Sequence, residues 1–313
     1  MVHVKIFLTQ LSPLILPLLK QVPSLYHVVW YRPICPLGTK MLPDGSACNV
    51  RAGVVCYHNR CLPLYKWFPL MFQMRLWRHW RGVFTRIVAN SEAVKRRLLG
   101  EGFEAVEVIP NGVPIRPIGP PPSQPPTIVF AGRLVREKGA DILLEAFAKV
   151  RRQIPHARLL LAGEGPEREA LNRLIASRQL SASVSMLGHL SQSEMERHFE
   201  GAWVQAVPSR WEEPFGLVAV EAMMRGTAVV ASRTGGLAEI VEDRRSGLLV
   251  PPSDVEALAG ALLGLLQNPD RAEQMGRAGR EAALARFSQS TYVERFIRLY
   301  QTLRDGGAQS NQS

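Results

Sequence analysis

Two glutamates, Glu213 and Glu221, are separated by seven residues in the stretch PSRWEEPFGLVAVEAMMRGTAVVAS. Acids at this spacing can form a solvated helix face, a metal site, an acid/base pair or a clamp for sugar hydroxyls. Pro214 fixes the loop and a helix is expected to start at Phe215–Leu217, so Glu213 precedes the helix and Glu221 lies on its second turn. The two acids therefore do not form one solvated stripe. No further acid or histidine joins them at ligand spacing, which disfavours a metal site.

The expected start of this helix is a candidate anion site. The backbone N–H groups of Gly216, Leu217 and Val218 have no acceptors within the helix. These free donors and the helix dipole favour an anion such as pyrophosphate. Carboxylates that accept hydrogen bonds from vicinal hydroxyls, next to donors that hold phosphate, indicate a nucleotide-sugar site.

Two earlier segments supply more groups of this kind. After an apolar run at 127–132, the sequence GRLVREKGA places Arg133 and Lys138 beside a helix start, where two cations can bind phosphate oxygens. After the run at 157–163, Gly163 and Gly165 allow a planar group to approach the backbone, although a plain turn explains this glycine pair as well. In doubly wound folds ligands bind beyond the carboxyl ends of the strands, where such loops meet.

The elements that must position these residues alternate regularly over 127–285. Near-continuous apolar strands between amphipathic helices predict a complete, doubly wound domain with a parallel sheet covered on both faces. Ser191 and Glu194 are expected to form a capping box at one helix start. The expected strands are 127–132, 157–163, 183–188, 202–207, 227–232 and 246–252.

Residues 1–113 predict a partial, Rossmann-like α/β domain, with strands at 24–31, 86–91 and 106–113 and a helix at 92–102. The proline-rich segment 114–126 is expected to be a stiff interdomain linker. A C-terminal helix over 286–305 is expected to pack back towards the N-terminal domain.

Charge is unevenly spread along the 313 residues, of which 46% are hydrophobic and 21% charged, as in soluble two-domain proteins. Residues 1–113 hold 14 Lys and Arg against 5 Asp and Glu, a net +9, whereas the remaining 200 residues hold 24 against 22, a net +2. An acidic partner is therefore expected at the N-terminal part. No nucleic-acid-binding module is recognisable, so nucleic acid is not expected.

The segment Tyr65–Arg86 mixes tryptophans with Arg and Lys, which suits a water–lipid boundary, although a buried helix with a basic outer face explains it as well. No membrane span is expected, because the apolar run Leu11–Leu19 is short and contains Pro13 and Pro17. We expect a cytoplasmic protein in peripheral contact with the inner face of an anionic membrane.

All four cysteines, Cys35, Cys48, Cys56 and Cys61, lie in the first 61 residues. Cys56 and Cys61, with His58 between them, approach zinc-ligand spacing. A structural metal, a disulfide and idle thiols all fit this pattern, and no metal is assigned.

Several motifs resemble, in order, those of the retaining GT-B glycosyltransferases related to glycogen and sucrose synthases (family four). In the second part of the chain these are GRLVREKG, the Glu–seven residues–Glu pattern, GGLAEIV and SGLLVPPSD. Upstream, YRPICPLG, ANSEAVKRRLL and VIPNGV are also similar. The resemblance covers nearly the whole chain and implies a GT-B-like fold.

The resemblance implies a role for each matching residue. Arg133 and Lys138 would neutralise the donor's diphosphate, Glu213 would bind the hydroxyls of the transferred sugar, and Glu221 would hold the ribose. The sugar would be transferred with retention of configuration, the leaving phosphate taking the acceptor's proton, with no metal or cofactor beyond the nucleoside-diphosphate sugar. The implied donor-binding residues are Gly132, Gly163, Gly165, Pro214, Phe215, Gly216, Leu217 and Glu221.

The chain departs from the family pattern in its first part. No strand followed by a glycine-rich loop precedes Val4, so a truncated N-terminal domain is expected. Val29 and Trp30 occupy the place of a His-Asp pair, and His27 lies two positions early. These departures support an alternative hypothesis, a catalytically impaired remnant that binds nucleotide sugars. A dinucleotide-dependent oxidoreductase is a third hypothesis, but the chain lacks the full glycine fingerprint of that class.

Overall fold

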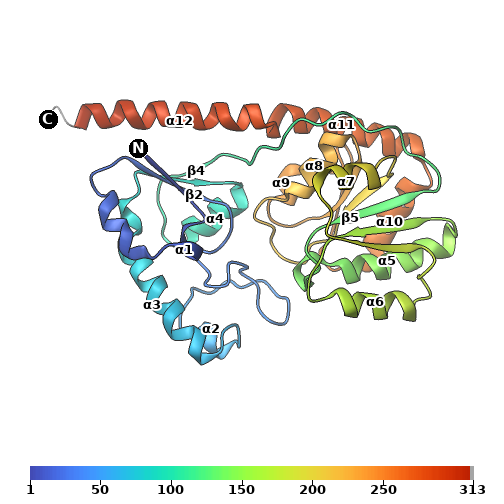
Figure 1. Ribbon diagram of the computed structural model, residues 1–313, viewed down its shortest axis with the longest axis horizontal. Coiled ribbons are helices and arrows are strands. Elements are labelled where there is room, and N and C mark those ends of the chain that lie inside the picture. Colours follow the sequence, from blue (N-terminus) through green and yellow to red (C-terminus); the bar gives the residue numbers. More distant parts are fainter. Residues whose placement is uncertain (311–313) are drawn as a thin grey trace. The chain divides into compact units, whose positions relative to one another are not determined.

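A computed structural model describes residues 1–310, without the side chains of Gln10 and of residues 305–310. The chain forms two compact units (Figure 1). The first unit contains residues 1–112 and the chain from 289 onward, and the second unit contains residues 113–288. The chain therefore leaves the first unit once and returns to it through its last helix.

The second unit contains a parallel sheet of six strands in the order β10-β9-β8-β5-β6-β7. From β5 the chain first adds β6 and β7 on one side and then β8 to β10 on the other. The switch point of this topology, where ligands bind in such folds, therefore lies between β5 and β8. The strands are β5 (Thr127–Ala131), β6 (Arg158–Ala162), β7 (Val184–Gly188), β8 (Val204–Val207), β9 (Ala228–Ser232) and β10 (Leu248–Val250).

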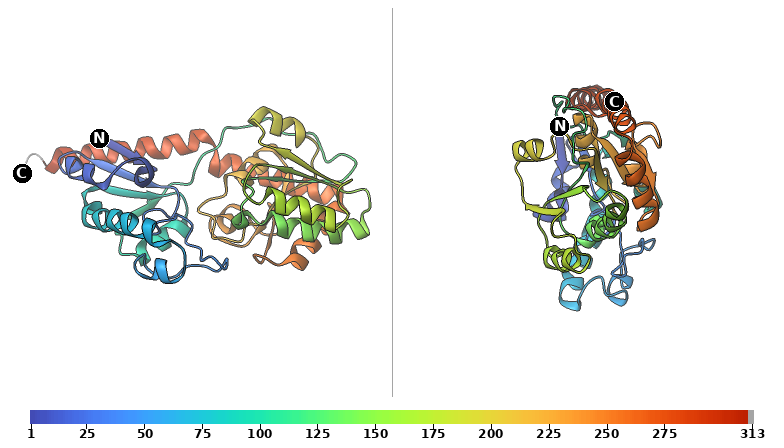
Figure 2. Two further views of the ribbon diagram at one scale, coloured as in Figure 1. Left: turned by 60° about the horizontal axis from the view of Figure 1, so that its bottom comes forward. Right: turned by 90° about the vertical axis from the view of Figure 1, so that its right-hand side faces the viewer.

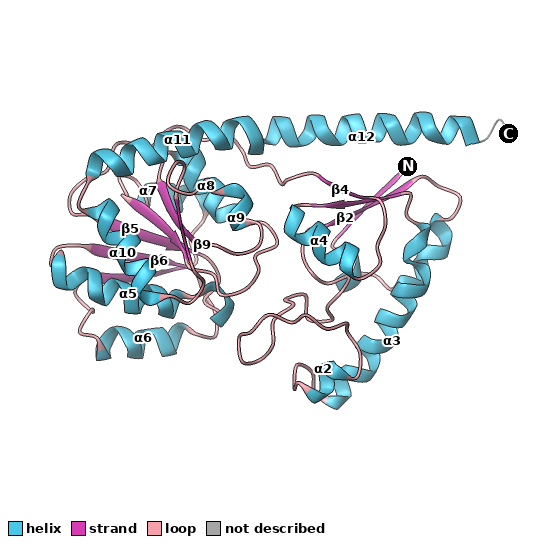
Figure 3. Cartoon of the chain, turned by 180° about the vertical axis from the view of Figure 1, so that it is seen from behind, coloured by secondary structure: helices cyan, strands magenta, loops and turns pink. Residues whose placement is uncertain are grey.

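Helices cover both faces of this sheet, and Figure 3 shows the magenta strands between them. Helices α5, α6 and α10 pack their apolar residues into one core cluster, whereas α8 and α9 belong to another and α11 contributes to both. The helices are η3 (Arg136–Lys138), α5 (Ala140–Gln153), α6 (Arg168–Ser177), α7 (Gln192–His198), α8 (Leu217–Arg225), α9 (Leu237–Ile240), α10 (Val255–Leu266) and α11 (Pro269–Phe287).

The six strands expected in this region all form, each one to four residues shorter than expected. The capping box of α7 is also confirmed, since Ser191 Oγ accepts from the Glu194 N–H and the Glu194 carboxylate accepts from the Ser191 N–H. The sequence therefore predicted the parallel sheet and its helices correctly.

The first unit contains a parallel sheet of four strands in the order β1-β2-β3-β4. The edge strand β1 was not expected from the sequence, because its four residues include two polar ones and leave little pattern. The expected strand at 106–113 ends at Val108, ahead of Pro110, which cannot donate a ladder hydrogen bond. The strands are β1 (Val2–Lys5), β2 (Ser24–Val28), β3 (Arg86–Ala89) and β4 (Val106–Val108).

The last helix, α12 (Gln289–Ser310), packs Phe296, Leu299 and Leu303 against Leu25 and Val88 of this sheet. In Figures 1 and 2 it is the red helix beside the blue strand β1. None of the helices within residues 1–310 is long and apolar enough to cross a membrane. The other helices are α1 (Phe7–Gln10), η1 (Pro13–Leu19), α2 (Val55–His58), α3 (Leu64–Trp80), η2 (Arg81–Val83) and α4 (Glu92–Gly100).

The proline-rich segment 114–126 is irregular but does not run free of the second unit. The Gly119 N–H donates to the Arg225 carbonyl at 2.8 Å, and the Ser123 N–H donates to the Gly201 carbonyl at 3.0 Å. Gly119 and Ser123 keep the N–H groups that proline lacks, and these two donors attach the segment to the end of α8 and to the loop after α7.

Candidate functional site

Lys138 and Glu213 meet at the switch point of the second unit. Lys138 closes η3 after β5, and Glu213 lies in the loop between β8 and α8. The Lys138 Nζ is 2.5 Å from the Glu213 Oε1, which also accepts a hydrogen bond of 2.7 Å from the Ser209 hydroxyl. Glu213 is only 4% exposed. Its carboxylate is therefore held between a cation and a hydroxyl at the carboxyl ends of β5 and β8.

Backbone packing and an ion pair hold these two loops together. Gly139 adopts a φ of +69°, and a Cβ there would lie 2.1 Å from the Pro208 carbonyl oxygen. Only glycine at position 139 therefore allows the two loops to approach this closely. Arg210 binds both carboxylate oxygens of Asp141, at 2.9 and 2.5 Å. This fork geometry fixes the loop after β8 against the start of α5.

The segment GGLAEIV holds the Glu213 loop from the other side. The Gly236 N–H donates to the Glu213 carbonyl at 2.8 Å, and a Cβ at Gly236 would lie 2.5 Å from the Phe215 carbonyl oxygen. The Phe215 ring is buried against Phe287, with 5.7 Å between ring centroids. The sequence alone gives this segment no structural role, and the structure shows that it orders the loop carrying Glu213.

Helix α8 starts where the sequence predicts it. Gly216, with a φ of +118°, is its N-cap, and no side chain among the described residues caps it. Pro214 and Phe215 precede the cap, and Leu217, which is 44% exposed, is the first helical residue. The first N–H groups of α8 remain available to an anion.

A cavity of about 420 Å³ lies next to these loops, at the carboxyl ends of β5, β6 and β7. Arg133 is exposed at its border, and Val218 on the first turn of α8 closes another side. Its apolar lining and its strand-end loops suit a planar ring. The lining residues are Ala131, Gly132, Arg133, Ala162, Gly163, Glu164, His189, Leu190, Met195 and Val218.

The glycines Gly163 and Gly165 bring the loops after β5 and β6 into contact. Gly163 has a φ of +144°, and a Cβ there would lie 1.8 Å from the Gly132 carbonyl oxygen. A Cβ at Gly165 would lie 2.3 Å from the Leu134 carbonyl oxygen. These glycines therefore permit close packing of backbone against backbone, which forms one wall of the cavity.

Glu221 lies one turn before Arg225 on α8 and contacts neither Lys138 nor Glu213 in any described interaction. Burial raises the pKa of the Glu221 carboxyl, and the nearby cations Arg225 and Arg116 oppose that rise. It does not line the cavity that contains Arg133. The structure therefore pairs Lys138 with Glu213, groups Arg133 with Gly132 and Gly163, and places Glu221 half-buried in the middle of α8.

Several residues around these groups were not predicted from the sequence. His189, Leu190 and Met195 line the cavity, while Ser209 and Arg210 hold the Glu213 loop. His189 comes directly after β7, so its place at a strand's carboxyl end was a usable signal. The others have common residue types and no motif that marks them.

His27 is part of the core of the first unit. Its ring is fully buried, with centroids 5.0 Å from Phe296 and 5.6 Å from His3, and neither ring nitrogen has a hydrogen-bond partner among the described residues. Burial lowers its pKa to about 3, with smaller contributions from Lys5 and His3. The Trp30 ring packs against Gly38, where a Cβ would lie only 2.7 Å from the ring. The expected His-Asp position therefore carries packing residues.

The four cysteines are half-buried free thiols. Burial raises the pKa of Cys56 and Cys61, which disfavours their thiolate forms. Within residues 1–310 no group of three or more His, Cys, Asp or Glu side chains is arranged to hold a metal ion.

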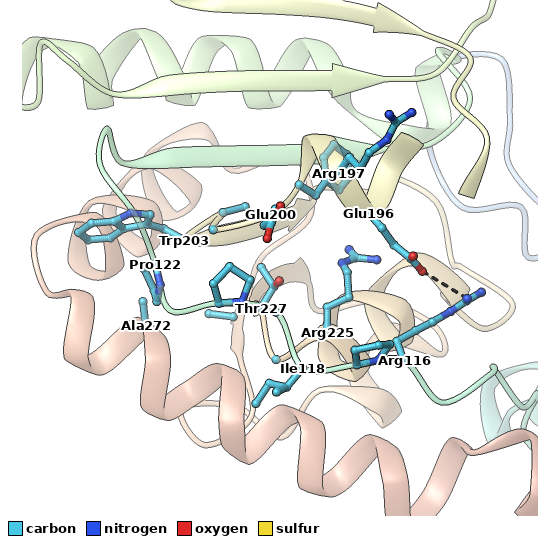
Figure 4. A pocket seen from close by; sticks show the side chains of 18 residues that line it. Arg116, Ile118, Pro122, Glu196, Arg197, Glu200, Trp203, Arg225, Thr227 and Ala272 are labelled. Carbon is cyan, nitrogen blue, oxygen red and sulfur yellow. Dashed lines mark ion pairs between the residues drawn. The ribbon is translucent and has the colours of Figure 1, made fainter. Parts of the chain in front are cut away.

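A second pocket, of about 250 Å³, lies beside the amino ends of β8 and β9. Figure 4 shows the ion pair between Arg116 and Glu196 at one side, with a separation of 3.3 Å, and Trp203 and Pro122 at the other. Arg225 also borders this pocket. None of the residues expected to bind the donor lines it.

The chain has two parallel sheets, and two loops are held together at the switch point of the larger sheet. These features define a doubly wound α/β protein. The family model described as glycosyl transferases group 1 matches residues 114–282, more than half of the chain. The chain belongs to this glycosyltransferase family.

Curated relatives agree with this assignment. Glycogen synthase of Mycobacterium tuberculosis is 32% identical over 216 residues, which cover 68% of this chain and 52% of that enzyme. Phosphatidyl-myo-inositol mannosyltransferase of the same organism is 33% identical over 234 residues, covering 71% and 61%. The chain spans about half the length of the curated relatives it matches.

Solved structures show the same two-sheet, GT-B-like architecture. Sucrose-phosphate synthase from Thermosynechococcus elongatus is 26% identical, with a TM-score of 0.73 over 97% of this chain and 74% of that one. Anabaena HepE, in complex with UDP and glucose, shares the fold with a TM-score of 0.68 at 21% identity, over 90% and 72%. The sequence-based expectation of this family and fold is thus confirmed, and the expected truncation stays an expectation.

Proposed function

We propose that this protein transfers a sugar from a nucleoside-diphosphate sugar to an acceptor with retention of anomeric configuration. The observation that carries the proposal is the contact between Lys138 and the buried Glu213 at the switch point, beside the open start of α8 and the cavity that Arg133 borders. Cations, free backbone donors and a carboxylate are the groups that a diphosphate and a sugar require.

In this proposal the nucleoside ring occupies the cavity, and the diphosphate lies against the first turn of α8. Arg133 and Lys138 neutralise the charge that grows on the leaving phosphate as the glycosidic carbon–oxygen bond breaks. Glu213 accepts hydrogen bonds from hydroxyls of the transferred sugar, and Glu221 holds the ribose. The acceptor oxygen forms the new bond on the same face, and its proton passes to the departing phosphate.

The donor-binding part of the proposal uses the second unit alone, Val113–Ser288. The function of the first unit as the acceptor side follows from the family resemblance. The enzyme would act in the cytoplasm, at or near the inner face of a membrane, on a glycan, lipid-linked or small acceptor.

The proposal is tested by calorimetry and thermal shift with UDP, GDP and ADP, followed by release of nucleotide from the matching donor sugar. One nucleotide should bind and raise the melting temperature, and its donor sugar should be turned over. Absence of binding by all three would contradict the donor site.

A second candidate function is nucleotide-sugar binding without catalysis. It is favoured by His27, whose buried ring cannot take part in transfer, and by Trp30, which packs against Gly38. Nucleotide binding without turnover of any donor sugar, with or without added acceptors, would select this second function.

A further inference from the structure

Helix α3 of the first unit carries apolar residues on two opposite faces. One face is buried, with Met74 and Trp77 at 1% and 0% exposure, and the Trp77 indole donates to the Pro33 carbonyl at 2.9 Å. This face accounts for the stability of α3 in the unit. The opposite face has no such role in the fold.

The outer face of α3 exposes large side chains to solvent. Tyr65, Phe68 and Phe72 are 74%, 62% and 64% exposed, and Leu64 beside them is 49% exposed. Their spacing of three, four and seven residues places them on one stripe of the helix. Single exposed apolar residues are ordinary, but a stripe of aromatic ones marks an interaction surface.

The neighbouring segment η1 extends this stripe. Leu14 and Leu18 are 64% and 78% exposed, and Leu11 just before them is 50% exposed. Leu11 and Leu14 line a shallow hollow together with Phe72 of α3. In Figure 1 the dark-blue chain after α1 runs beside α3. We call the surface formed by Leu11, Leu14, Leu18, Leu64, Tyr65, Phe68 and Phe72 the apolar face.

Cations accompany the aromatic rings of α3. Lys66 lies 5.7 Å from the centroid of the Tyr65 ring, and Lys20 lies 4.8 Å from that of Trp80. Arg75 is exposed on the same stripe of α3, one turn after Phe72. Aromatic rings beside ammonium and guanidinium groups suit the headgroup region of an anionic bilayer. There the apolar parts of the side chains are buried while their charged ends stay hydrated.

We propose that the apolar face inserts into the headgroup region of an anionic lipid bilayer. A bilayer fits this face better than a second copy of the chain, because residues 1–113 carry a net +9 and two such surfaces would repel each other. An anionic bilayer attracts the same charge. The inference concerns the first unit and goes beyond the proposed donor site, which lies in the second.

Flotation of the full chain with lipid vesicles tests the inference. Wild-type protein should float with vesicles that contain phosphatidylglycerol and bind more weakly to pure phosphatidylcholine. The affinity of the double variant Leu14→Asp/Phe72→Asp for both kinds of vesicle should be at least about tenfold lower than that of the wild type. This variant removes apolar area that the bilayer would bury and adds anionic charge. The triple variant Lys20→Gln/Lys66→Gln/Arg75→Gln should lose the preference for phosphatidylglycerol and its dependence on salt.

A matched control is Leu99→Asp/Ile297→Asp, since these residues are also 46% and 48% exposed in the first unit but lie outside the apolar face. This control should float like the wild type. Failure of the wild type to float, or equal flotation of Leu14→Asp/Phe72→Asp, would overturn the inference. The inference would also be overturned if light scattering showed a wild-type dimer that only the Leu14→Asp/Phe72→Asp substitutions abolish. In that case a second copy of the chain would cover the apolar face.

Nucleotide calorimetry on the same samples separates this inference from the proposed function. Variants of the apolar face should bind nucleotide as the wild type does, which also shows that the second unit is folded. Far-ultraviolet circular dichroism and a melting curve check the first unit.

Discussion

The ammonium group of Lys138 lies 2.5 Å from the carboxylate of Glu213, and the two residues come from loops that follow β5 and β8, 75 residues apart in sequence. Glu213 is nearly inaccessible, whereas the Lys138 side chain is 21% exposed. The cation can therefore turn towards an incoming diphosphate more readily than the carboxylate can move. Such a contact holds both side chains in place before a ligand arrives.

Replacing Glu213 by Gln should reduce sugar transfer about 100-fold or more, because the substitution removes the charged acceptor beside the reacting sugar. The side chain keeps its size, so nucleotide affinity should change only a few-fold. Initial rates of nucleotide release and calorimetry with the bare nucleotide measure the two effects. Glu169→Gln, at an exposed position on α6, serves as control. Undiminished turnover in Glu213→Gln would refute the donor-site assignment.

Replacing Lys138 by Met should lower the free energy of unfolding of the second unit by about 1–3 kcal/mol, because it leaves the buried Glu213 carboxylate without its cation. It should also weaken nucleotide binding. The double variant Lys138→Met/Glu213→Gln should recover part of the lost stability but none of the activity. Urea denaturation of the wild type, the two single variants and the double variant gives the coupling energy between Lys138 and Glu213. If the two single changes in unfolding free energy simply added up in the double variant, the pair would contribute no coupling.

Replacing Gly163 by Ala should destabilise the second unit by about 1–3 kcal/mol or more, because its φ of +144° and the Gly132 carbonyl oxygen leave no room for a Cβ. Nucleotide binding should fall with it, since the two backbones form a wall of the cavity. The matched control is Gly260→Ala in α10, where nothing lies within 4 Å and a gain of about 0.5–1 kcal/mol is expected. Equal melting temperatures of the two variants would contradict this account.

Acid should destabilise the first unit through His27. Its pKa is about 3 when folded and near 6.5 when unfolded, so below 6.5 the unfolded chain takes up a proton that the folded one does not. Stability is thus full above pH 6.5 and falls towards pH 3, by about 2 kcal/mol between pH 6.5 and 5. His3, whose pKa is also lowered by burial, adds to this trend.

Denaturation of His27→Phe across this pH range measures the effect. Phe fits among the aromatic neighbours Phe296 and Tyr292, so the variant should lose most of the acid dependence. The exposed His156, in the second unit, provides the control variant His156→Phe. An unchanged pH profile of His27→Phe would show that other groups carry the acid sensitivity.

The sheet of the second unit was predictable because its strands are continuous apolar runs, such as TIVFA, and its helices repeat with a period near 3.6. Edge strand β1 was not, since VHVK has only four residues, too few for its alternation of apolar and polar residues to stand out. Pairing with β2 decides its conformation, and that information lies outside the strand itself.

The site was predictable only in part. The sequence singled out Lys138 and Glu213, which the structure brings into contact, whereas the assignment of Glu221 to the ribose stays a prediction and the structure places this residue near Arg225 and Arg116. Distances between loops depend on packing, such as Gly139 against Pro208 and Gly236 against Phe215. Sequence spacing along one loop does not encode such contacts.

The close approach of Gly139 to Pro208, with the fork of Arg210 on Asp141, has a thermodynamic consequence. Both loops lose their conformational entropy when the second unit folds, not when a ligand binds. Association at this point then requires little further ordering of the backbone, and affinity should follow the polar contacts that each ligand makes. Calorimetric heat-capacity changes should correspondingly match the surface area that the ligand itself covers.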